Sequence, residues 1–161
     1  MVAAVFAERL RERGLELPPQ APPRHPYLAF REDDGVLYLS GKTPMLDGKV
    51  QFRGPLRTAD DIELGRQAAV LCTLQVLSAI EDAVGLERVA SILRLTAYVS
   101  SAPEFEAQPD VANAASQLFT EILGPAGGHT RSAVGVAALP GGSAVELEVT
   151  VRLHPRAEGG A

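Results

Sequence analysis

The sequence has few residues that can cross-link the chain or bind a metal ion. It contains one cysteine, Cys72, so no internal disulfide can form. Three histidines are scattered along the chain and no second thiol accompanies them, which excludes a closed zinc site of the usual kind. We therefore expect a protein without metal or cofactor, in the cytoplasm, where thiols stay reduced.

Positive charge is also in short supply. Fifteen Lys and Arg residues face twenty Asp and Glu residues, which leaves a formal charge of −5 and a pI near 5.2. A protein whose main partner is a phosphate backbone needs a basic surface. We therefore expect no nucleic-acid partner.

The sequence shows no sign of a targeting or membrane segment. Residues 1–14 run from apolar to charged, which is the reverse of a secretory signal. No apolar run approaches the length that spans a bilayer. The chain is expected to be a mature protein with no membrane partner.

The familiar catalytic motifs are missing as well. The sequence contains no nucleophile elbow, phosphate loop, dinucleotide fingerprint, metalloprotease helix or EF-hand loop. The glycine-rich segment 124–128 (GPAGG) lacks the Lys and Ser or Thr of a phosphate-binding loop. These absences disfavour the common enzyme classes.

What is present fits one globular domain with an N-terminal addition. The chain has 161 residues, of which 46% are apolar and 22% charged, so it is neither disordered nor membrane-embedded. Residues 1–26 predict a short helix that Gly14 ends, followed by a proline-rich strap. Residues 27–154 predict an α+β domain, and residues 155–161 a flexible tail.

The hydrophobic periodicity of residues 27–154 predicts the element order ββαβαββ. A Thr-x-x-acid pattern beginning at Thr58 is typical of a helix start, and Gly85 is typical of a helix end. This order predicts a single-sheet sandwich with both helices on one face. The expected strands are 27–31, 36–40, 89–100, 131–138 and 144–153, and the expected helices are 58–84 and 109–123.

The sheet face away from the helices is expected to be polar. In strand 89–100 the alternation predicts that Leu93, Leu95, Ala97 and Val99 face the helices. The opposite face is polar but not uniformly charged, which suits a subunit interface with a small polar pocket better than open solvent. The residues expected on that face are Arg94, Thr96, Tyr98, Arg131, Glu146 and Glu148.

Arg131 and Glu146 are the strongest candidates for chemistry. They are expected on neighbouring strands of a hairpin that turns at residues 139–142. The guanidinium of Arg131 can grip a carboxylate with two parallel hydrogen bonds, and the Glu146 carboxylate can orient or deprotonate a water. The alternative is a simple cross-strand ion pair between the two residues.

Other reactive residue types have a plain structural interpretation beside the functional one. Cys72 lies on the apolar stripe of the first long helix, which indicates a buried structural thiol. His129 lies two residues before Arg131, either at a pocket rim or in an exposed loop. Tyr27 either covers the sheet edge or lines a pocket.

Two segments near the C-terminus resemble a known family. Residues 131–140 (RSAVGVAALP) and 145–148 (VELE) are similar to the signature strands of the Rid family, the reactive intermediate deaminase or YjgF-type family once labelled endoribonuclease L-PSP. Residues 39–44 (LSGKTP) match a further stretch. Tyr27 and Asn113 match in order as well, so the resemblance covers about residues 25–153.

The resemblance implies a chorismate-mutase-like (YjgF/L-PSP) fold and a homotrimer around a central barrel, with three clefts between subunits. Family members with the arginine hydrolyse imines or enamines of 2-amino acids to 2-keto acids and ammonia. By position, Arg131 matches the arginine that binds the substrate carboxylate, and Glu146 the glutamate that activates water. Ala133 stands where many members have cysteine, and its main chain would line the pocket. Tyr27, Ser40 and Asn113 match pocket residues.

Two other functions remain open beside the deaminase. One is a non-catalytic trimer that binds small carboxylate metabolites. The other is RNA cleavage, which the family's older label suggests and which the negative charge and the lack of a histidine pair disfavour. The sequence departs from the family in its N-terminal addition, in Lys42 at a usual glutamine position, and in a longer loop between Phe105 and Asn113.

Overall fold

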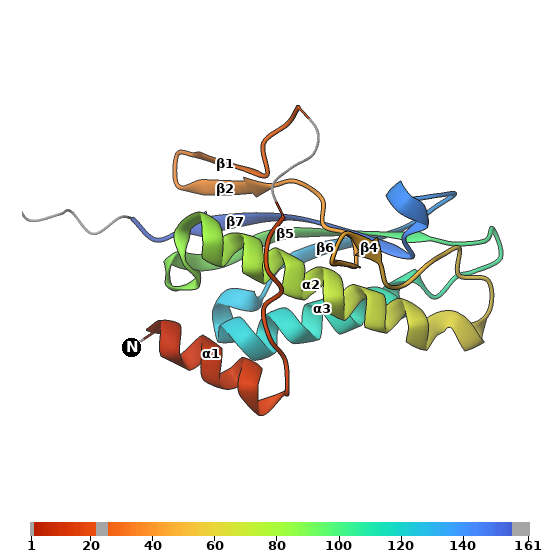
Figure 1. Cartoon of the computed structure of the whole chain (residues 1–161), viewed down its shortest axis with the longest axis horizontal. Coiled ribbons are helices and arrows are strands. Elements are labelled where there is room, and N and C mark those ends of the chain that lie inside the picture. The colour runs from red at the N-terminus through yellow and green to blue at the C-terminus, as the bar shows by residue number, and fades with distance from the viewer. Residues whose placement is uncertain (1, 22–25, 156–161) are drawn as a thin grey trace, which may run out of the picture.

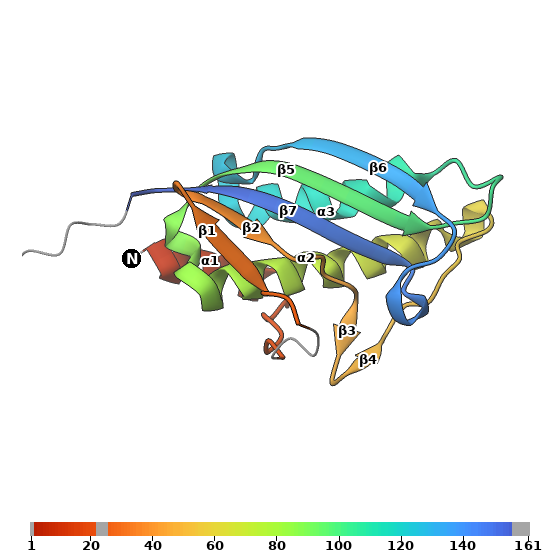
Figure 2. The same cartoon turned by 90° about the horizontal axis from the view of Figure 1, so that it is seen from above.

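The computed structural model describes residues 2–21 and 26–155, with side chains from residue 4 onward. It has one five-stranded sheet in the order β1-β2-β7-β5-β6, and helices α2 and α3 cover one face of it (Figures 1 and 2). The predicted α+β fold is thus confirmed. The helices are α1 (Val2–Glu12), α2 (Ile62–Val84) and α3 (Gln108–Leu123); the strands are β1 (Phe30–Asp33), β2 (Val36–Leu39), β3 (Met45–Leu46), β4 (Lys49–Val50), β5 (Val89–Ser100), β6 (Thr130–Val136) and β7 (Val145–Leu153).

Helix α2 is the central helix of the core. It begins after the single 3-10 turn Ala59–Asp61, where the Asp61 carboxylate accepts the backbone N–H groups of Arg57 and Thr58 at 2.6 and 3.0 Å. These bonds lower the pKa of Asp61. The helix ends at Gly85, whose φ of +87° suits glycine.

By length and composition alone, α2 with its preceding turn is apolar enough to cross a membrane. The expectation that no apolar stretch reaches this length is therefore wrong. However, 61% of the helix window is buried inside the fold, as expected for the core helix of a soluble domain. Cys72 is among its fully buried residues, as predicted.

The β1–β2 hairpin turns at Asp34 and Gly35, whose φ values of +47° and +70° are typical of a tight two-residue turn. Strand β1 begins at Phe30, three residues later than predicted from Tyr27. The hairpin curls up on the side of the sheet away from the helices (Figure 1). The almost wholly apolar sequence of β2 (VLYL) predicts a strand buried on both faces, but Tyr38 is 50% exposed, so the outer face is not covered.

Strand β5 has a register irregularity that the alternation pattern did not reveal. Its pairing with β7 shifts between Ile92 and Arg94. As a result Ile92 is buried and Leu93 is 38% exposed, so the predicted inward position of Leu93 is wrong. Beyond the shift the alternation holds, and Arg94, Thr96 and Tyr98 lie on the face away from the helices.

Strands β6 and β7 do not form the predicted hairpin. Strand β5 lies between them, parallel to β6 and antiparallel to β7. The parallel pair is possible because α3 supplies the crossover that two parallel strands require. The consequence for the site is large: Arg131 pairs with buried Leu95 on the helix side, whereas Glu146 pairs with Tyr98 on the open face.

The N-terminal addition packs onto the helical layer. Leu10 of α1 is 5% exposed and belongs to the core, and the Arg9 guanidinium donates to the Ile122 carbonyl at 2.7 Å. The strap then crosses α2, where the Ser78 hydroxyl donates to the Pro18 carbonyl at 2.6 Å. Residues 22–25 of the predicted strap, which include His25, and the predicted tail beyond Pro155 lie outside the described residues.

Lys42 connects the strap to the sheet. Its ammonium donates to Gln20 Oε1 at 2.9 Å, and Gln20 in turn donates to the Gln75 side chain of α2 at 2.8 Å. Burial lowers the pKa of Lys42 from its usual range. Lys42 therefore anchors the segment that precedes the domain and points to the helix side.

Candidate functional site

Arg131 lies on edge strand β6 and reaches across to α3. Its Nη1 donates to Asn113 Oδ1 at 2.9 Å and to Ser116 Oγ at 3.0 Å. Its Nη2 has one long contact, 3.5 Å, to the Pro109 carbonyl. No carboxylate in the described part of the chain forms an ion pair with Arg131.

These bonds leave one side of the Arg131 guanidinium free. Both Nη1 hydrogens are used by Asn113 and Ser116, while the Nε hydrogen and one Nη2 hydrogen have no acceptor among residues 2–21 and 26–155. Nε–H and Nη2–H are parallel, which is the geometry that binds a carboxylate with two hydrogen bonds. Ala133 lies two residues further along β6 on the same face.

Glu146 lies on the open face, at the edge of a concavity of about 720 Å³. The walls come from the β1–β2 hairpin and the segment after it, and the floor from β5 and β7. Figure 2 looks onto this face, with the helices behind the strands. Its lining includes Leu28, Tyr38, Ser40, Gly41, Tyr98, Glu146 and Glu148.

The Glu146 carboxylate packs against the backbone of Gly41. A Cβ at position 41 would overlap Glu146 Oε1, so this close approach requires glycine. Burial, and secondarily the charge of Glu148, raise the pKa of Glu146 above its usual value. No hydrogen bond to the Glu146 side chain is present among the described residues.

Glu148 differs from Glu146 although it lies on the same face. It accepts the Tyr98 hydroxyl at 2.9 Å and is exposed. That hydrogen bond is the main reason why the pKa of Tyr98 is raised. Glu148 is thus held by its neighbour, whereas Glu146 is half-buried and has its oxygens available.

The structure therefore divides the predicted site residues into two groups. Arg131, Asn113 and Ala133 lie at the helix side of β6, while Glu146 and Ser40 line the open-face concavity. Tyr27 is 54% exposed and immediately precedes Leu28, which lines that concavity. The expectation that Arg131 and Glu146 share a face is wrong, because the strands are not a hairpin. The alternative of a cross-strand ion pair is excluded within one chain for the same reason.

Ser116 and His129 join the Arg131 group, and neither was selected as a site residue from the sequence. His129 Nε2 lies 2.9 Å from Ser116 Oγ, and His129 Nδ1 lies 2.7 Å from the Gly127 carbonyl oxygen. Of the two interpretations of His129, the exposed loop histidine is wrong, since His129 is half-buried and its ring meets Phe119 edge-on at 6.0 Å. The i, i+3 spacing of Asn113 and Ser116 on α3 was the available signal.

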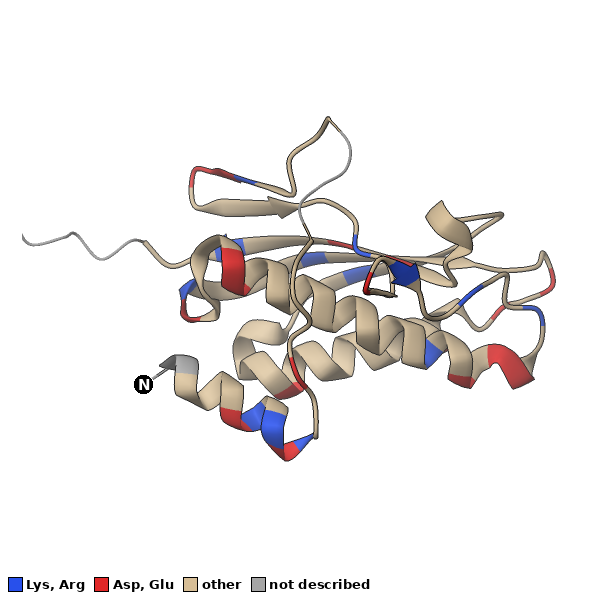
Figure 3. Cartoon of the chain, in the orientation of Figure 1, with Lys and Arg blue, Asp and Glu red and all other residues tan. Residues whose placement is uncertain are grey.

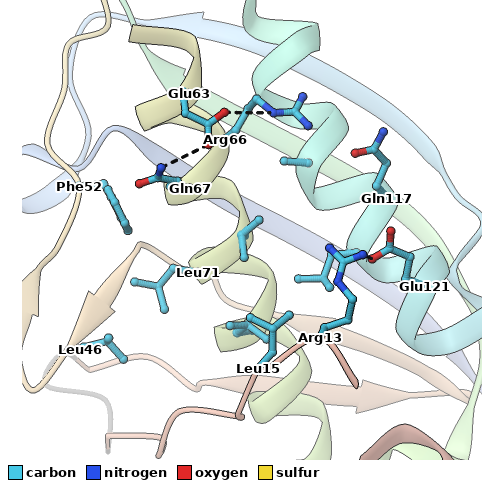
Figure 4. Close-up of a pocket in the computed structure, with 14 residues that line it drawn as sticks. Arg13, Leu15, Leu46, Phe52, Glu63, Arg66, Gln67, Leu71, Gln117 and Glu121 are labelled. Carbon is cyan, nitrogen blue, oxygen red and sulfur yellow. Dashed lines mark hydrogen bonds and ion pairs between the residues drawn. The ribbon is translucent and has the colours of Figure 1, made fainter. Parts of the chain in front are cut away.

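A second large hollow lies on the helical side and differs in its charges. It has a volume of about 530 Å³ and an apolar floor between α2 and α3 (Figure 4). Its charged residues pair with each other, Arg13 with Glu121 at 2.8 Å and Arg66 with Glu63 at 3.8 Å. All four of these charged side chains are therefore already paired, so none of them is an unpaired charge that could bind a ligand.

Metal and nucleic-acid chemistry find little support in the described part of the chain. No group of three or more His, Cys, Asp or Glu side chains is placed to hold a metal ion there. Burial raises the pKa of the Cys72 thiol well above its usual value, which makes it a poor nucleophile. Figure 3 shows basic and acidic residues interspersed along the described chain.

Comparison with known proteins gives one consistent family. Residues 7–149 match the family model described as "YjgF/chorismate mutase-like, putative endoribonuclease". Protein TCP17 of Trypanosoma cruzi is 38% identical over 150 residues, covering 92% of this chain and 94% of that protein. Among solved structures, Atu1372 of Agrobacterium tumefaciens, a protein of unknown function, has 35% identity and a TM-score of 0.87 over 95% of both chains. A Shewanella oneidensis protein described as a "putative endoribonuclease" has 30% identity and a TM-score of 0.86, over 92% of this chain and 99% of that one.

Proposed function

Because the chain belongs to the YjgF/chorismate-mutase-like family, which includes the Rid proteins, we propose that it hydrolyses small 2-imino acids, or their enamines, to 2-keto acids and ammonia. The observation that carries the proposal is the arrangement of the Arg131 guanidinium. Asn113 and Ser116 hold Nη1, while the Nε–Nη2 side has only one long contact among the described residues, 3.5 Å from Nη2 to the Pro109 carbonyl. The reaction needs no cofactor, and the proposed location is the cytoplasm, where amino-acid metabolism generates such imines.

In this proposal Arg131 binds the substrate carboxylate. A charge-assisted pair of parallel hydrogen bonds fixes both the position and the plane of the carboxylate, and with it the adjacent imine carbon. The backbone at Ala133, on the same face of β6, lies beside the substrate. Asn113 contributes by holding Nη1 of Arg131.

Glu146 activates the water. The carboxylate accepts a proton as the water oxygen bonds to the carbon of the protonated imine, which gives a neutral tetrahedral carbinolamine. Glu146 then returns this proton to the amine nitrogen, and ammonia leaves as the C–N bond breaks and the hydroxyl loses its proton to form the carbonyl. Half-burial beside Gly41, and the charge of Glu148, raise the pKa of Glu146 and so make it a stronger base than an exposed glutamate. Ser40 and Tyr27 are proposed to border this side of the substrate.

In this proposal the two groups come from different subunits. Within one chain Arg131 and Glu146 lie on opposite faces of the sheet. We therefore propose a homotrimer in which edge strand β6 of one copy meets the open face of the next. Large exposed apolar side chains on that face, including Tyr38 at 50%, Val134 at 42% and Leu28 at 65%, support a covered interface. Light scattering should give about three times the chain mass of 17.0 kDa.

A non-catalytic carboxylate-binding trimer is the second candidate, since it uses the same Arg131 fork without chemistry at Glu146. Ammonia release separates the two functions. The substrate, 2-iminopropanoate, is generated in place from alanine by an amino-acid oxidase. A rate well above spontaneous hydrolysis is expected, whereas a rate equal to that of buffer, with pyruvate still bound, would favour the binding protein.

A further inference from the structure

Ser116 and His129 form a hydrogen-bonded chain that ends at the Arg131 guanidinium. The Gly127 carbonyl oxygen lies 2.7 Å from His129 Nδ1, His129 Nε2 lies 2.9 Å from Ser116 Oγ, and Ser116 Oγ lies 3.0 Å from Arg131 Nη1. The carbonyl, the imidazole, the hydroxyl and the guanidinium thus follow one another without a gap. Gly127 is buried, and Ser116, His129 and Arg131 are half-buried.

The direction of each hydrogen bond follows from its ends. A carbonyl only accepts, so Nδ1 of His129 carries a hydrogen, and in the Nδ1–H tautomer Nε2 accepts. A guanidinium only donates, so Ser116 Oγ accepts from Arg131 and gives its own hydrogen to Nε2. Every donor and acceptor in this chain is satisfied by one arrangement of hydrogens.

This arrangement restricts the Arg131 side chain. A serine hydroxyl alone can rotate, but the imidazole fixes its hydrogen and therefore turns its lone pairs toward Nη1. With Asn113 on the second Nη1 hydrogen, the plane of the guanidinium is set from two directions. That plane determines where Nε–H and Nη2–H point.

We propose that Ser116 and His129 are positioning residues that orient the Arg131 fork for the substrate carboxylate, acting through the Nε2 atom of His129. The inference rests on the proposed function, because it assumes that Arg131 binds a carboxylate. It assigns His129 no contact with substrate. Phe119, whose ring meets the imidazole edge-on, keeps the histidine ring in place.

Two substitutions of His129 distinguish this role from a purely structural one. In His129→Gln the amide oxygen reaches the position of Nε2 and can still accept from Ser116. In His129→Asn the shorter amide reaches only the position of Nδ1, so it can bond the Gly127 carbonyl but not Ser116. If the histidine merely held the Gly127 turn, Asn would be the better replacement.

The measurement is calorimetric titration of 2-oxobutanoate into the full-length chain, wild type, His129→Gln, His129→Asn and Arg131→Ala, each confirmed as folded by circular dichroism. We expect His129→Asn to raise the Kd about threefold to tenfold, as for loss of one hydrogen bond in the chain. The Kd of His129→Gln should stay within about twofold of the wild-type value. Arg131→Ala should weaken binding far more, roughly 10- to 150-fold.

The alternative outcomes are distinguishable. If both His129 variants bind as the wild type does and only Arg131→Ala binds more weakly, the positioning role is wrong and the proposed function stands. If His129→Gln binds more weakly than His129→Asn, the histidine holds the turn instead. If Arg131→Ala binds with unchanged affinity, the proposed function itself fails and the positioning role with it.

Discussion

Arg131 and Glu146 differ in how much of their surroundings a single chain provides. Arg131 is held on one side by Asn113 and Ser116 and is open on the other. Glu146 packs against Gly41, carries a raised pKa and has no hydrogen-bond donor in the described part of the chain. The binding half of the proposed site is therefore pre-organised by the fold, whereas the half that activates water is completed only when water, substrate and a second subunit arrive.

The largest effect is expected from Glu146→Gln, which tests only the part of the proposed site that activates water. The amide keeps the shape but cannot accept the proton, so turnover of 2-iminopropanoate should fall roughly 10²- to 10⁴-fold while the Kd for pyruvate changes little. Glu148→Gln is the matched control on the same strand face, and it should keep most of the activity. Equal turnover in wild type and Glu146→Gln would remove the general-base role.

Arg131→Ala tests the part of the proposed site that binds the substrate carboxylate. Loss of a charge-assisted bidentate pair is worth about 1.5–3 kcal/mol, which weakens binding of 2-oxobutanoate roughly 10- to 150-fold. Arg131→Lys should restore little, because an ammonium cannot form the parallel pair. Calorimetric titration gives both affinities, and an unchanged Kd in the alanine variant would make Arg131 a structural residue.

Gly41→Ala sharpens the comparison, because it changes the position of the Glu146 carboxyl group but leaves the glutamate itself in place. The added methyl group overlaps the Glu146 carboxyl group and must displace it. Displacement of the general base is expected to lower kcat about tenfold and to leave the affinity for pyruvate unchanged. Steady-state ammonia release measures the first quantity and calorimetry the second. A variant with wild-type kcat would show that the close approach of Gly41 and Glu146 is irrelevant to turnover.

The smallest expected effect is on pH dependence. A general base acts in its deprotonated form, so activity should be lost as pH falls through the pKa of Glu146, which lies above the ordinary glutamate value. Glu148→Gln removes the neighbouring negative charge, lowers the pKa of Glu146 and should shift the acid limb of kcat/KM to lower pH. An acid limb that moves to higher pH, or stays in place, would contradict the electrostatic coupling of the two carboxylates.

Local patterns were sufficient to predict the elements of the fold. Strand 89–100 and the helix ending at Leu123 were predicted from alternation and from apolar spacing, which depend only on neighbours in sequence. The partner of strand β6 could not be predicted in this way. A Pro-Gly-Gly segment between two alternating stretches is typical of a hairpin, and only tertiary packing places β5 between them. The bulge that turns Leu93 outward has no local signature either.

The candidate site was predictable to the same extent. Arg131 and Glu146 could be identified from their residue types and from the resemblance to a family. The face of the sheet on which each lies depends on the strand order. Ser116 and His129 are separated by a helix end and a 3-10 turn, and their contact depends on how Gly124–Gly127 folds back. A sequence pattern does not specify such a contact, because it arises from three elements at once.

The central claim is that Arg131 and Glu146 of one active site belong to different subunits. It is tested most directly by co-expressing two variants that are each inactive, Arg131→Ala and Glu146→Gln, and measuring ammonia release from the mixed trimers. If each site takes its arginine from one copy and its glutamate from the next, random assembly restores about a quarter of the wild-type sites, and activity should recover to that level. Mixed trimers as inactive as the separate variants would contradict the shared site.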